Sequence, residues 1–311
     1  MKFTAPDTNT TWSAGSAYTA TWSPDSAVFG SYVTLGLYLD NLFLASLASS
    51  TQNTGSIQVT LPQGLATGKN YRIRMTSGTN ALVYGSSRYF SIGGIAADAL
   101  EPNDSAGAAK AVVPNSARQN LSLSYRDKDW MRFAAKAQML YIIQAVSATT
   151  LATTLRLWPE SGTGALLTNT KTSSDTLNSL AWVASADGNY AVSLEAVSSA
   201  AYGAYAFEIK EVDPASYKLP VSVPASGAAF KAGEAISIQW SDPAAVKGYV
   251  DLFLYDASGV VQTIAANQAN NGSYAWTAPA GLPARSDYYV KIISRLNSGI
   301  NGVSGAFSLA P

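Results

Sequence analysis

The chain has 311 residues, with 20 basic and 20 acidic side chains, and it contains neither cysteine nor histidine. The zero formal charge argues against nucleic acid as a partner, since nucleic-acid binding needs a basic surface. The lack of histidine removes Ser-His and Cys-His catalysis and the commonest zinc ligand, and we expect no enzymatic activity. No stretch is long and apolar enough to predict membrane insertion. The length favours two or three domains.

Most segments alternate between apolar and polar residues with the period of two that is typical of β-strands. Residues 33–39 alternate in this way, and residues 71–75 place basic side chains on one face and apolar side chains on the other. Glycine, proline, asparagine and aspartate interrupt these segments at short intervals, a rhythm typical of antiparallel β-sandwiches. The sequence predicts one helical turn, the alanine-rich stretch 105–112, capped by Asp104 or Ser105.

The two ends of the chain repeat each other. Turn residues and aromatic residues recur at an offset of 218 and then, after a one-residue gap, of 217. The pairs include Pro6 and Pro224, Gly15 and Gly233, Trp22 and Trp240, Pro62 and Pro279, Tyr71 and Tyr288, and Phe90 and Phe307. Such a repeat predicts two copies of one independent domain. The predicted domains are residues 1–94, 98–213 and 217–311.

The repeated residues also resemble a known family. In the first copy they are Pro6, Thr11-Trp12, Gly15, Thr21-Trp22-Ser23, Leu37-Tyr38, Tyr71-Arg72-Ile73 and Phe90-Ser91-Ile92. This set resembles the immunoglobulin-like module of fungal glucan-assembly proteins, also called the Ser-Thr-rich glycosylphosphatidylinositol-anchored membrane family. The resemblance implies an immunoglobulin-like β-sandwich at each end of the chain.

The middle segment resembles a second family, the bacterial pre-peptidase C-terminal domain. The matching motifs are Glu101-Pro102-Asn103-Asp104-Ser105, Asp127-x-Asp129-Trp130-x-x-Phe133, Leu155-x-Leu157-Trp158, Gly188-x-Tyr190 and Gly203-x-Tyr205-x-Phe207. The resemblance implies a jelly-roll-like sandwich of the kind appended to secreted peptidases, with the collagen-binding domains of clostridial collagenases as relatives. The expected fold is therefore all-β, with three β-sandwich domains in series (immunoglobulin-like, jelly-roll-like, immunoglobulin-like).

Two short acidic clusters stand out in a chain that is only 13% charged. They supply four carboxylates and one amide, from Glu101, Asn103, Asp104, Asp127 and Asp129. Hard oxygen donors of this kind suit calcium, which takes roughly 6–8 oxygen ligands. Resemblance to the collagen-binding relatives implies the same five residues as calcium ligands. Those relatives carry a further acidic ligand where this chain has Ala99, which leaves a site for one ion.

A second interpretation of the same residues needs no metal. Asp104 would cap the helical turn, Glu101 would pair with a lysine or arginine, and Asp129 would anchor a turn. Arg126 and Lys128 could then neutralise the carboxylates. Both interpretations stay open at the level of sequence.

The tryptophans and the closest pair of aspartates have structural interpretations. Trp22 and Trp240 lie in apolar–polar alternations that place them in the sandwich cores. We expect Trp130 in a core as well, set against Phe133. Two aspartates at positions 127 and 129 could mimic a glycosidase pair, but the turn of the pre-peptidase family accounts better for their flanking sequence.

These observations predict a non-catalytic accessory or adhesive part of a secreted or surface-attached bacterial protein. Its partner would be an extracellular polymer, either a polysaccharide or a matrix protein, or a surface partner, with calcium stiffening the junction between the first and middle domains. The alternatives are the C-terminal tail of a secreted peptidase and a structural subunit of a surface fibre. The expected location is extracellular or at the cell surface, with a signal peptide already removed.

Overall fold

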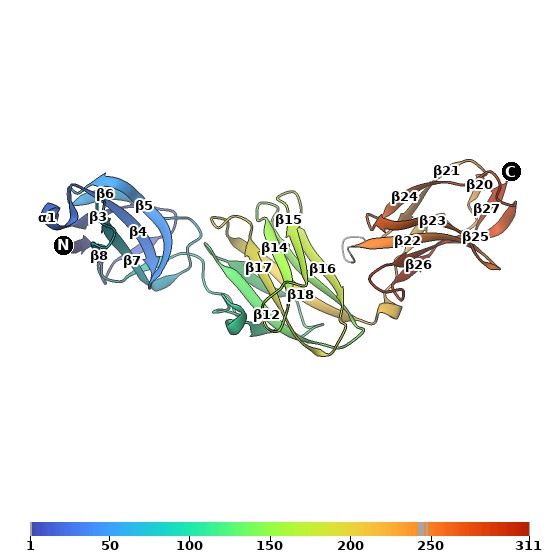
Figure 1. Cartoon of the computed structure of the whole chain (residues 1–311), viewed down its shortest axis with the longest axis horizontal. Coiled ribbons are helices and arrows are strands. Elements are labelled where there is room, and N and C mark those ends of the chain that lie inside the picture. Colours follow the sequence, from blue (N-terminus) through green and yellow to red (C-terminus); the bar gives the residue numbers. More distant parts are fainter. Residues whose placement is uncertain (1, 242–245, 247, 311) are drawn as a thin grey trace.

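The computed structural model describes residues 2–241, 246 and 248–310. Three β-sandwiches follow one another along the long axis of the molecule, with the termini toward opposite ends (Figure 1). Within the described residues the helices are confined to single turns. The predicted all-β class and the three sandwiches in series are confirmed.

The first sandwich packs a three-stranded sheet, in the order β1-β3-β6, on a sheet in the order β2-β9-β7-β4-β5, with β8 paired to β7. Its strands are β1 Phe3–Ala5, β2 Thr11–Ser13, β3 Ala17–Trp22, β4 Tyr32–Leu39, β5 Leu42–Gln52, β6 Ser56–Thr60, β7 Gly68–Ser77, β8 Tyr84–Ser86 and β9 Phe90–Gly93. A helical turn, α1 (Ser26–Phe29), begins after Asp25, whose carboxylate accepts a hydrogen bond from the Val28 amide.

The middle sandwich packs the sheet β10-β12-β17-β14-β15 on the sheet β11-β18-β13-β16. Its elements are η1 Ala106–Ala108, β10 Lys110–Ala111, β11 Gln119–Leu123, β12 Lys128–Ala135, β13 Leu140–Ser147, β14 Thr153–Pro159, β15 Leu167–Lys171, β16 Leu177–Val183, β17 Gly188–Ala196, β18 Gly203–Val212 and η2 Pro214–Ser216. In both sheets, strands that are distant in sequence lie side by side: β12 pairs with β17, and β13 pairs with β18. This pairing brings together the sequence motifs of the middle segment.

The third sandwich repeats the topology of the first, with the sheets β19-β21-β24 and β20-β27-β25-β22-β23 and with β26 paired to β25. Its strands are β19 Val221–Val223, β20 Ala229–Lys231, β21 Ala235–Trp240, β22 Tyr249–Asp256, β23 Gly259–Ala269, β24 Ser273–Thr277, β25 Arg285–Ser294, β26 Asn301–Val303 and β27 Phe307–Ala310. The repeat therefore extends from residue identity to strand order.

The repeated tryptophans fill the cores of the outer sandwiches, as predicted. Trp22 and Trp240 are each 4% exposed. The indole N–H of Trp22 donates to Asn53 Oδ1 at 2.8 Å, and that of Trp240 donates to Asn270 Oδ1 at 2.6 Å. Each copy thus pairs its buried indole with an asparagine at the equivalent position, which satisfies the one polar group of the ring.

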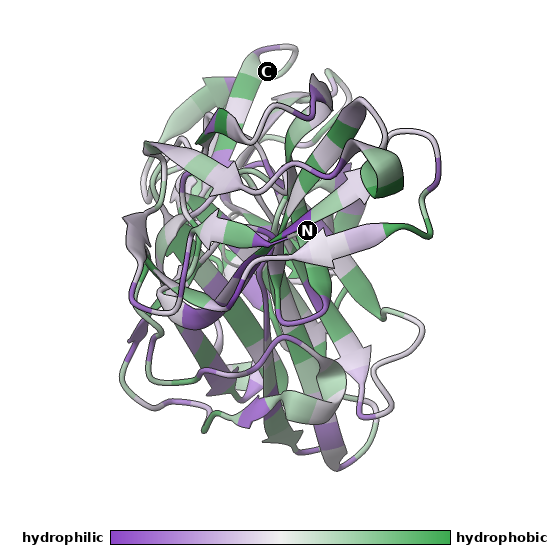
Figure 2. Ribbon diagram, turned by 90° about the vertical axis from the view of Figure 1, so that its left-hand side faces the viewer, coloured by the Kyte–Doolittle hydropathy of each residue, from purple (hydrophilic) through white to green (hydrophobic). Residues whose placement is uncertain are grey.

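The period of two is visible in burial as well as in sequence. In β7 the side chains alternate between buried and half-buried from Tyr71 to Ser77, and the same alternation runs along the equivalent β25. Many strands accordingly show alternating hydrophobic and hydrophilic segments (Figure 2). One face of each such strand is in the core, and the other is available to solvent or to a neighbour.

Two details of the prediction are wrong. The stretch 105–112 forms only the 3₁₀ turn η1, without a side-chain cap, and then enters strand β10. Trp130 does not pack against Phe133, because residues three apart on one strand point to opposite faces of the sheet. Phe133 lies in the main core, whereas Trp130 packs with Ala109 and Trp158 on the outer face.

The sandwiches meet at two different junctions. At the first, the Tyr125 amide donates to the Gly64 carbonyl at 2.7 Å, and the Tyr202 hydroxyl donates to Gln63 Oε1 at 2.8 Å. At the second, apolar side chains of the middle sandwich join the hydrophobic core of the third. These are Leu140, Ile142 and Ala181, which share one cluster with Leu219. The first junction therefore combines hydrogen bonds with the packing of Tyr125 against the core of the first sandwich, whereas the second is apolar.

Candidate metal centre

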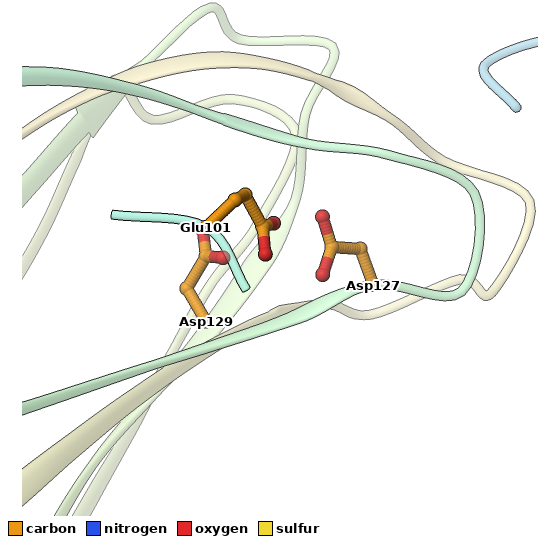
Figure 3. Close-up of side chains that lie close together, drawn as sticks. All are labelled: Glu101, Asp127 and Asp129. Carbon is orange, nitrogen blue, oxygen red and sulfur yellow. The ribbon is translucent and has the colours of Figure 1, made fainter. Parts of the chain in front are cut away.

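Three carboxylates, two from the start of strand β12 and one from the segment that enters the domain, lie at the end of the middle sandwich that faces the first. Asp127 directly precedes β12, and Asp129 is its second residue, so both point to the same face. Glu101 approaches them from the segment that enters the domain, and the three side chains point toward one another (Figure 3). One carboxylate oxygen of each lies within 4.8 Å of the others. We call these three residues the carboxylate cluster.

Asn103 completes the cluster. Its side chain is fully buried, with its amide 3.2 Å from Glu101 Oε2 and 3.1 Å from Asp129 Oδ1. With the amide nitrogen facing the carboxylates, Asn103 donates a hydrogen bond to both. With the amide oxygen facing them, the same residue makes an all-oxygen site. The structure thus brings four of the five predicted ligands into one group.

Asp129 carries the largest electrostatic cost. It lies on the face of β12 that also holds the core residues Met131 and Phe133, and it is fully buried. Burial raises its pKa to about 8, and the charges of neighbouring carboxylates add to the effect. Its Oδ2 accepts a hydrogen bond of 2.5 Å from the Tyr205 hydroxyl, which favours the ionised form and offsets part of the shift.

Two further acids of the site, Glu101 and Asp104, show the same crowding. Burial, together with the charges of Asp127 and Asp104, raises the pKa of Glu101 to about 7. Burial also raises the pKa of Asp104, and so does its side-chain hydrogen bond with Asp127. Two carboxylates in such contact must share a proton or a cation. Asp104, the fifth predicted ligand, thus borders the cluster through Asp127 although it lies outside the group of three.

The basic residues nearby are engaged elsewhere. Lys128 lies 3.5 Å from Glu195 and over the Trp130 ring, and Arg126 lies over the Phe43 ring and donates to the Phe43 carbonyl at 3.4 Å. Across the described residues, no ion pair joins a lysine or arginine to the carboxylate cluster. The interpretation without a metal therefore lacks the neutralising contacts on which it depends.

Two residues at the site were not predicted as part of it. Asp98 accepts hydrogen bonds from the Leu100 and Ser122 amides, and its charge adds to the pKa shift of Asp129. Tyr205 lies 76 positions from Asp129 in the chain. Tyr205 entered the sequence analysis only through a family motif, and nothing local in the sequence marks its hydroxyl as a partner of Asp129.

A cavity of about 590 Å³ separates the cluster from the first sandwich. Leucines of the first domain form one wall, including Leu42 and Leu44, and Glu101, Asp104 and Asp127 form part of the other. The cluster is therefore open to small ions from the side of the junction, while Asp129 stays behind it.

The donor set fits calcium. Carboxylate and amide oxygens are the ligands that this ion prefers, and Glu101, Asn103, Asp104, Asp127 and Asp129 would hold it. A divalent cation would remove the mutual repulsion that raises the pKa values at the site. The geometry does not suit glycoside hydrolysis, because Asp129 is fully buried beneath Tyr205 and has no open face toward a substrate.

Comparison with known protein families finds a match for both outer sandwiches. Residues 5–92 and 223–309 match the family described as the Kre9/KNH-like N-terminal Ig-like domain, and together they make up more than half of the 311 residues. The chain belongs to the Kre9/KNH-like family. The two Kre9/KNH-like regions coincide with the first and third sandwiches, which confirms the resemblance to glucan-assembly modules that the repeat predicted.

The Kre9/KNH-like chain is also similar to several solved structures. One is the pre-peptidase C-terminal domain of a Bacillus anthracis collagenase, with 14% identity, 33% of this chain and 94% of that chain covered, and a TM-score of 0.28. Another is SGBP-B of a Bacteroides ovatus mixed-linkage glucan utilization locus, solved with a heptasaccharide, with 13% identity, coverage of 100% and 67%, and a TM-score of 0.23.

A third is the pair of fibronectin(III)-like modules of Clostridium thermocellum CbhA, with 10% identity, coverage of 99% and 90%, and a TM-score of 0.21. The name of the first of these structures is that of the family which the middle segment resembles. Similarity at this level gives no conclusion about a ligand of the Kre9/KNH-like chain. No curated protein matches the chain. Among its described residues, no helix is long and apolar enough to cross a membrane.

Proposed function

We propose that this Kre9/KNH-like protein is a non-catalytic accessory or adhesive part of a secreted or surface-attached bacterial protein, located outside the cell or at its surface. Its three sandwiches would bind an extracellular polymer, either a polysaccharide or a matrix protein, or hold a partner away from the surface. Calcium at the carboxylate cluster would stiffen the junction between the first and middle sandwiches.

The proposal rests mainly on one observation, the position of the carboxylate cluster at the junction between the first and middle sandwiches. Its carboxylates have no lysine or arginine partner among the described residues, and they lie where one domain meets the next. Asp127 is two residues from Tyr125, whose amide bonds to Gly64 across the junction. Neutralising the cluster would therefore order the same loop that links the two domains.

Both the residues available for catalysis and the immunoglobulin-like topology of the outer sandwiches support a non-catalytic role. The sequence contains no histidine to activate a serine. Glu101 and Asp129, the acids whose pKa values are raised to about 7 and 8, have carboxylate oxygens within 4.8 Å of each other. A glycosidase pair would instead stand on either side of an open substrate site. Outer sandwiches with immunoglobulin-like topology commonly serve as binding or spacing units, although the fold alone does not set the function.

The calcium part is tested by thermal unfolding in chelator and in excess calcium. A ligand at about 100 times its dissociation constant stabilises a fold by roughly 2.7 kcal/mol, which is a measurable rise in Tm. The Asp127→Asn variant should lose this rise, and Asp175→Asn, a matched change at an exposed carboxylate of the same domain, should keep it. Equal Tm values in chelator and calcium, with no metal in the purified protein, would rule out the site.

The binding part is tested separately, by screening the whole chain against polysaccharides and collagen with and without calcium. The proposal predicts binding to at least one polymer. It also predicts that chelation weakens binding wherever the polymer contacts both the first and the middle sandwich. Failure to bind any of them, with calcium present and the protein folded, would contradict an adhesive role.

A further inference from the structure

The first sandwich carries a row of aromatic and cationic side chains on the outer face of its larger sheet. The row crosses four neighbouring strands and consists of Phe43 on β5, Tyr38 on β4, Arg74 on β7 and Tyr84 on β8. We call these four residues the aromatic–cation strip. Its outermost rings are well exposed, 42% for Phe43 and 56% for Tyr84.

The strip holds Arg74 in a fixed position. Its guanidinium carbon lies 4.5 Å from the centre of the Tyr38 ring and 4.5 Å from that of the Tyr84 ring. Tyr38 in turn packs edge-on against Phe43, with ring centres 5.3 Å apart. Gly36 makes room for both rings, since a side chain there would approach each of them to about 3 Å. A planar cation between two rings is pre-oriented and partly desolvated.

Arg74 has no polar partner within the described part of the chain. It makes neither a hydrogen bond nor an ion pair there, and its Nε is buried without a partner. Arg72, its neighbour on the same face, also has a buried, unpartnered Nε and lies 5.6 Å from the ring of Tyr89, which is 44% exposed. Two guanidinium groups on one surface, without a counter-charge, are suited to an anion.

The third sandwich offers a comparison within the same chain. Tyr255 occupies the place of Tyr38, and Lys291 occupies the place of Arg74 and lies 5.6 Å from the Tyr255 ring. There, however, Arg285 is paired with Asp287 at 2.8 Å and with Asp256 at 3.6 Å. The first copy has Leu39 and Asn70 where the third has these two aspartates. Arg285, however, stands where the first copy has Gly68, and Lys291, like Arg74, forms no ion pair among the described residues. The first copy differs in having an arginine in place of this lysine, and no aspartate at positions 39 and 70.

From this geometry we infer that the aromatic–cation strip binds an acidic polysaccharide, one whose sugar units carry carboxylates. This inference rests on the proposed function and names the class of polymer. The amino groups of Arg74 can donate paired hydrogen bonds to a uronate carboxylate, and the exposed ring of Tyr84 beside it offers a flat face to a sugar ring. Nucleic acid shares the anionic chemistry, but its duplex carries one negative charge per roughly 1.7 Å, far more than the two guanidinium groups of this surface can neutralise, and its binding is one outcome of the test.

The test is affinity electrophoresis of the full chain in gels that contain polygalacturonate, a neutral β-glucan or double-stranded DNA. We expect polygalacturonate to retard the wild-type protein, with a retardation that weakens as salt is added. Arg74→Gln should weaken this binding at least about tenfold, the usual effect of losing a charge-assisted hydrogen bond. Lys2→Gln removes the same charge next to β1, in the opposite sheet, and should behave like the wild type.

Tyr84→Ala provides a second variant, because the side chain is exposed and its loss leaves the core intact. It should also weaken binding to polygalacturonate, with an unchanged Tm. Wild-type affinity in folded Arg74→Gln and Tyr84→Ala would overturn the inference. Equal binding of DNA and polygalacturonate would overturn it as well.

The failure of this inference can be told apart from the failure of the proposed function. Retardation by the neutral β-glucan that neither variant reduces would leave the proposed function in place and remove the role of the strip. If neither polysaccharide retards the protein and collagen does not bind it either, both proposals fail together.

Discussion

Replacing Asp129 by asparagine should stabilise the protein when calcium is removed and destabilise it when calcium is present. Asp129 is fully buried, and its folded-state pKa of about 8 lies far above the ordinary 3.8. At pH 7 the unfolded chain has released this proton and the folded protein retains it. Each pH unit between the unfolded pKa of 3.8 and pH 7 lowers the free energy of unfolding by about 1.36 kcal/mol. Ionisation of this carboxyl in the unfolded chain therefore destabilises the folded protein by about 4 kcal/mol at pH 7.

Asparagine avoids this cost while keeping the local contacts. Its amide oxygen can accept the hydrogen bond from Tyr205, and its amide nitrogen can donate to the side-chain oxygen of Asn103, whose amide lies 3.1 Å from Asp129 Oδ1. In chelator at pH 7 we expect Asp129→Asn to raise the free energy of unfolding by up to about 4 kcal/mol. For a small domain each kcal/mol shifts Tm by roughly 4–8 °C. In excess calcium the variant has lost a charged ligand and should melt below the wild type.

Differential scanning calorimetry in chelator and in excess calcium measures both effects. Asp175→Asn, at an exposed carboxylate in the same domain, is the control and should shift Tm little in either condition. The diagnostic result is the change of sign between the two conditions. A variant that melts lower than the wild type in chelator would refute the reasoning, because Asp129 would then contribute to the calcium-free fold rather than oppose it.

Three further predictions follow from the same contacts. In chelator, the wild-type Tm should fall as pH rises from about 5 to 8, because the folded cluster, with pKa values of about 7 and 8, binds protons that the unfolded chain has released; a rising Tm over this interval would contradict it. Asn270→Ala should cost about 1–3 kcal/mol in urea unfolding, since it leaves the buried indole N–H of Trp240 without its acceptor. Gly64→Ala should open the first junction, measured as a larger radius of gyration in X-ray scattering, because its new carbon would lie 2.2 Å from the Tyr202 ring; an unchanged radius would count against this contact.

The outer sandwiches were predictable because their strands alternate regularly between apolar and polar residues and because the sequence contains two copies of the same domain. Alternation along β7 and β25 marks which side chains are buried, and the shared offset shows that both copies use the same positions. Trp22 and Trp240 could therefore be assigned to cores from sequence. Their asparagine partners could not, because Asn53 and Asn270 lie about 30 residues away in loops whose path depends on the whole sheet.

The sequence was enough to predict which residues gather at the candidate metal centre, but not how deeply they are buried or how far their pKa values shift. Motif spacing brought Glu101 and Asp129 to one end of the domain, since the entering segment must meet the start of β12. The degree of burial, and the hydroxyl of Tyr205 beneath Asp129, depend on the packing of β18 against β11 and β13. Trp130 shows the same limit, because a motif gives the residue but not the face of the strand on which it lies.

The contrast between the two junctions would give the proposed calcium site a specific mechanical role. The second junction buries Leu140, Ile142 and Ala181 in one core with Leu219, so the angle between the middle and third sandwiches is held by apolar packing that calcium does not touch. The first junction has a cavity of about 590 Å³ where such a core would be. Beside this cavity, Tyr125 packs against the core of the first sandwich and a few hydrogen bonds cross the junction, next to carboxylates that repel one another. Loss of the cation should therefore free the first sandwich, which carries the aromatic–cation strip, while the other two continue to move as one unit.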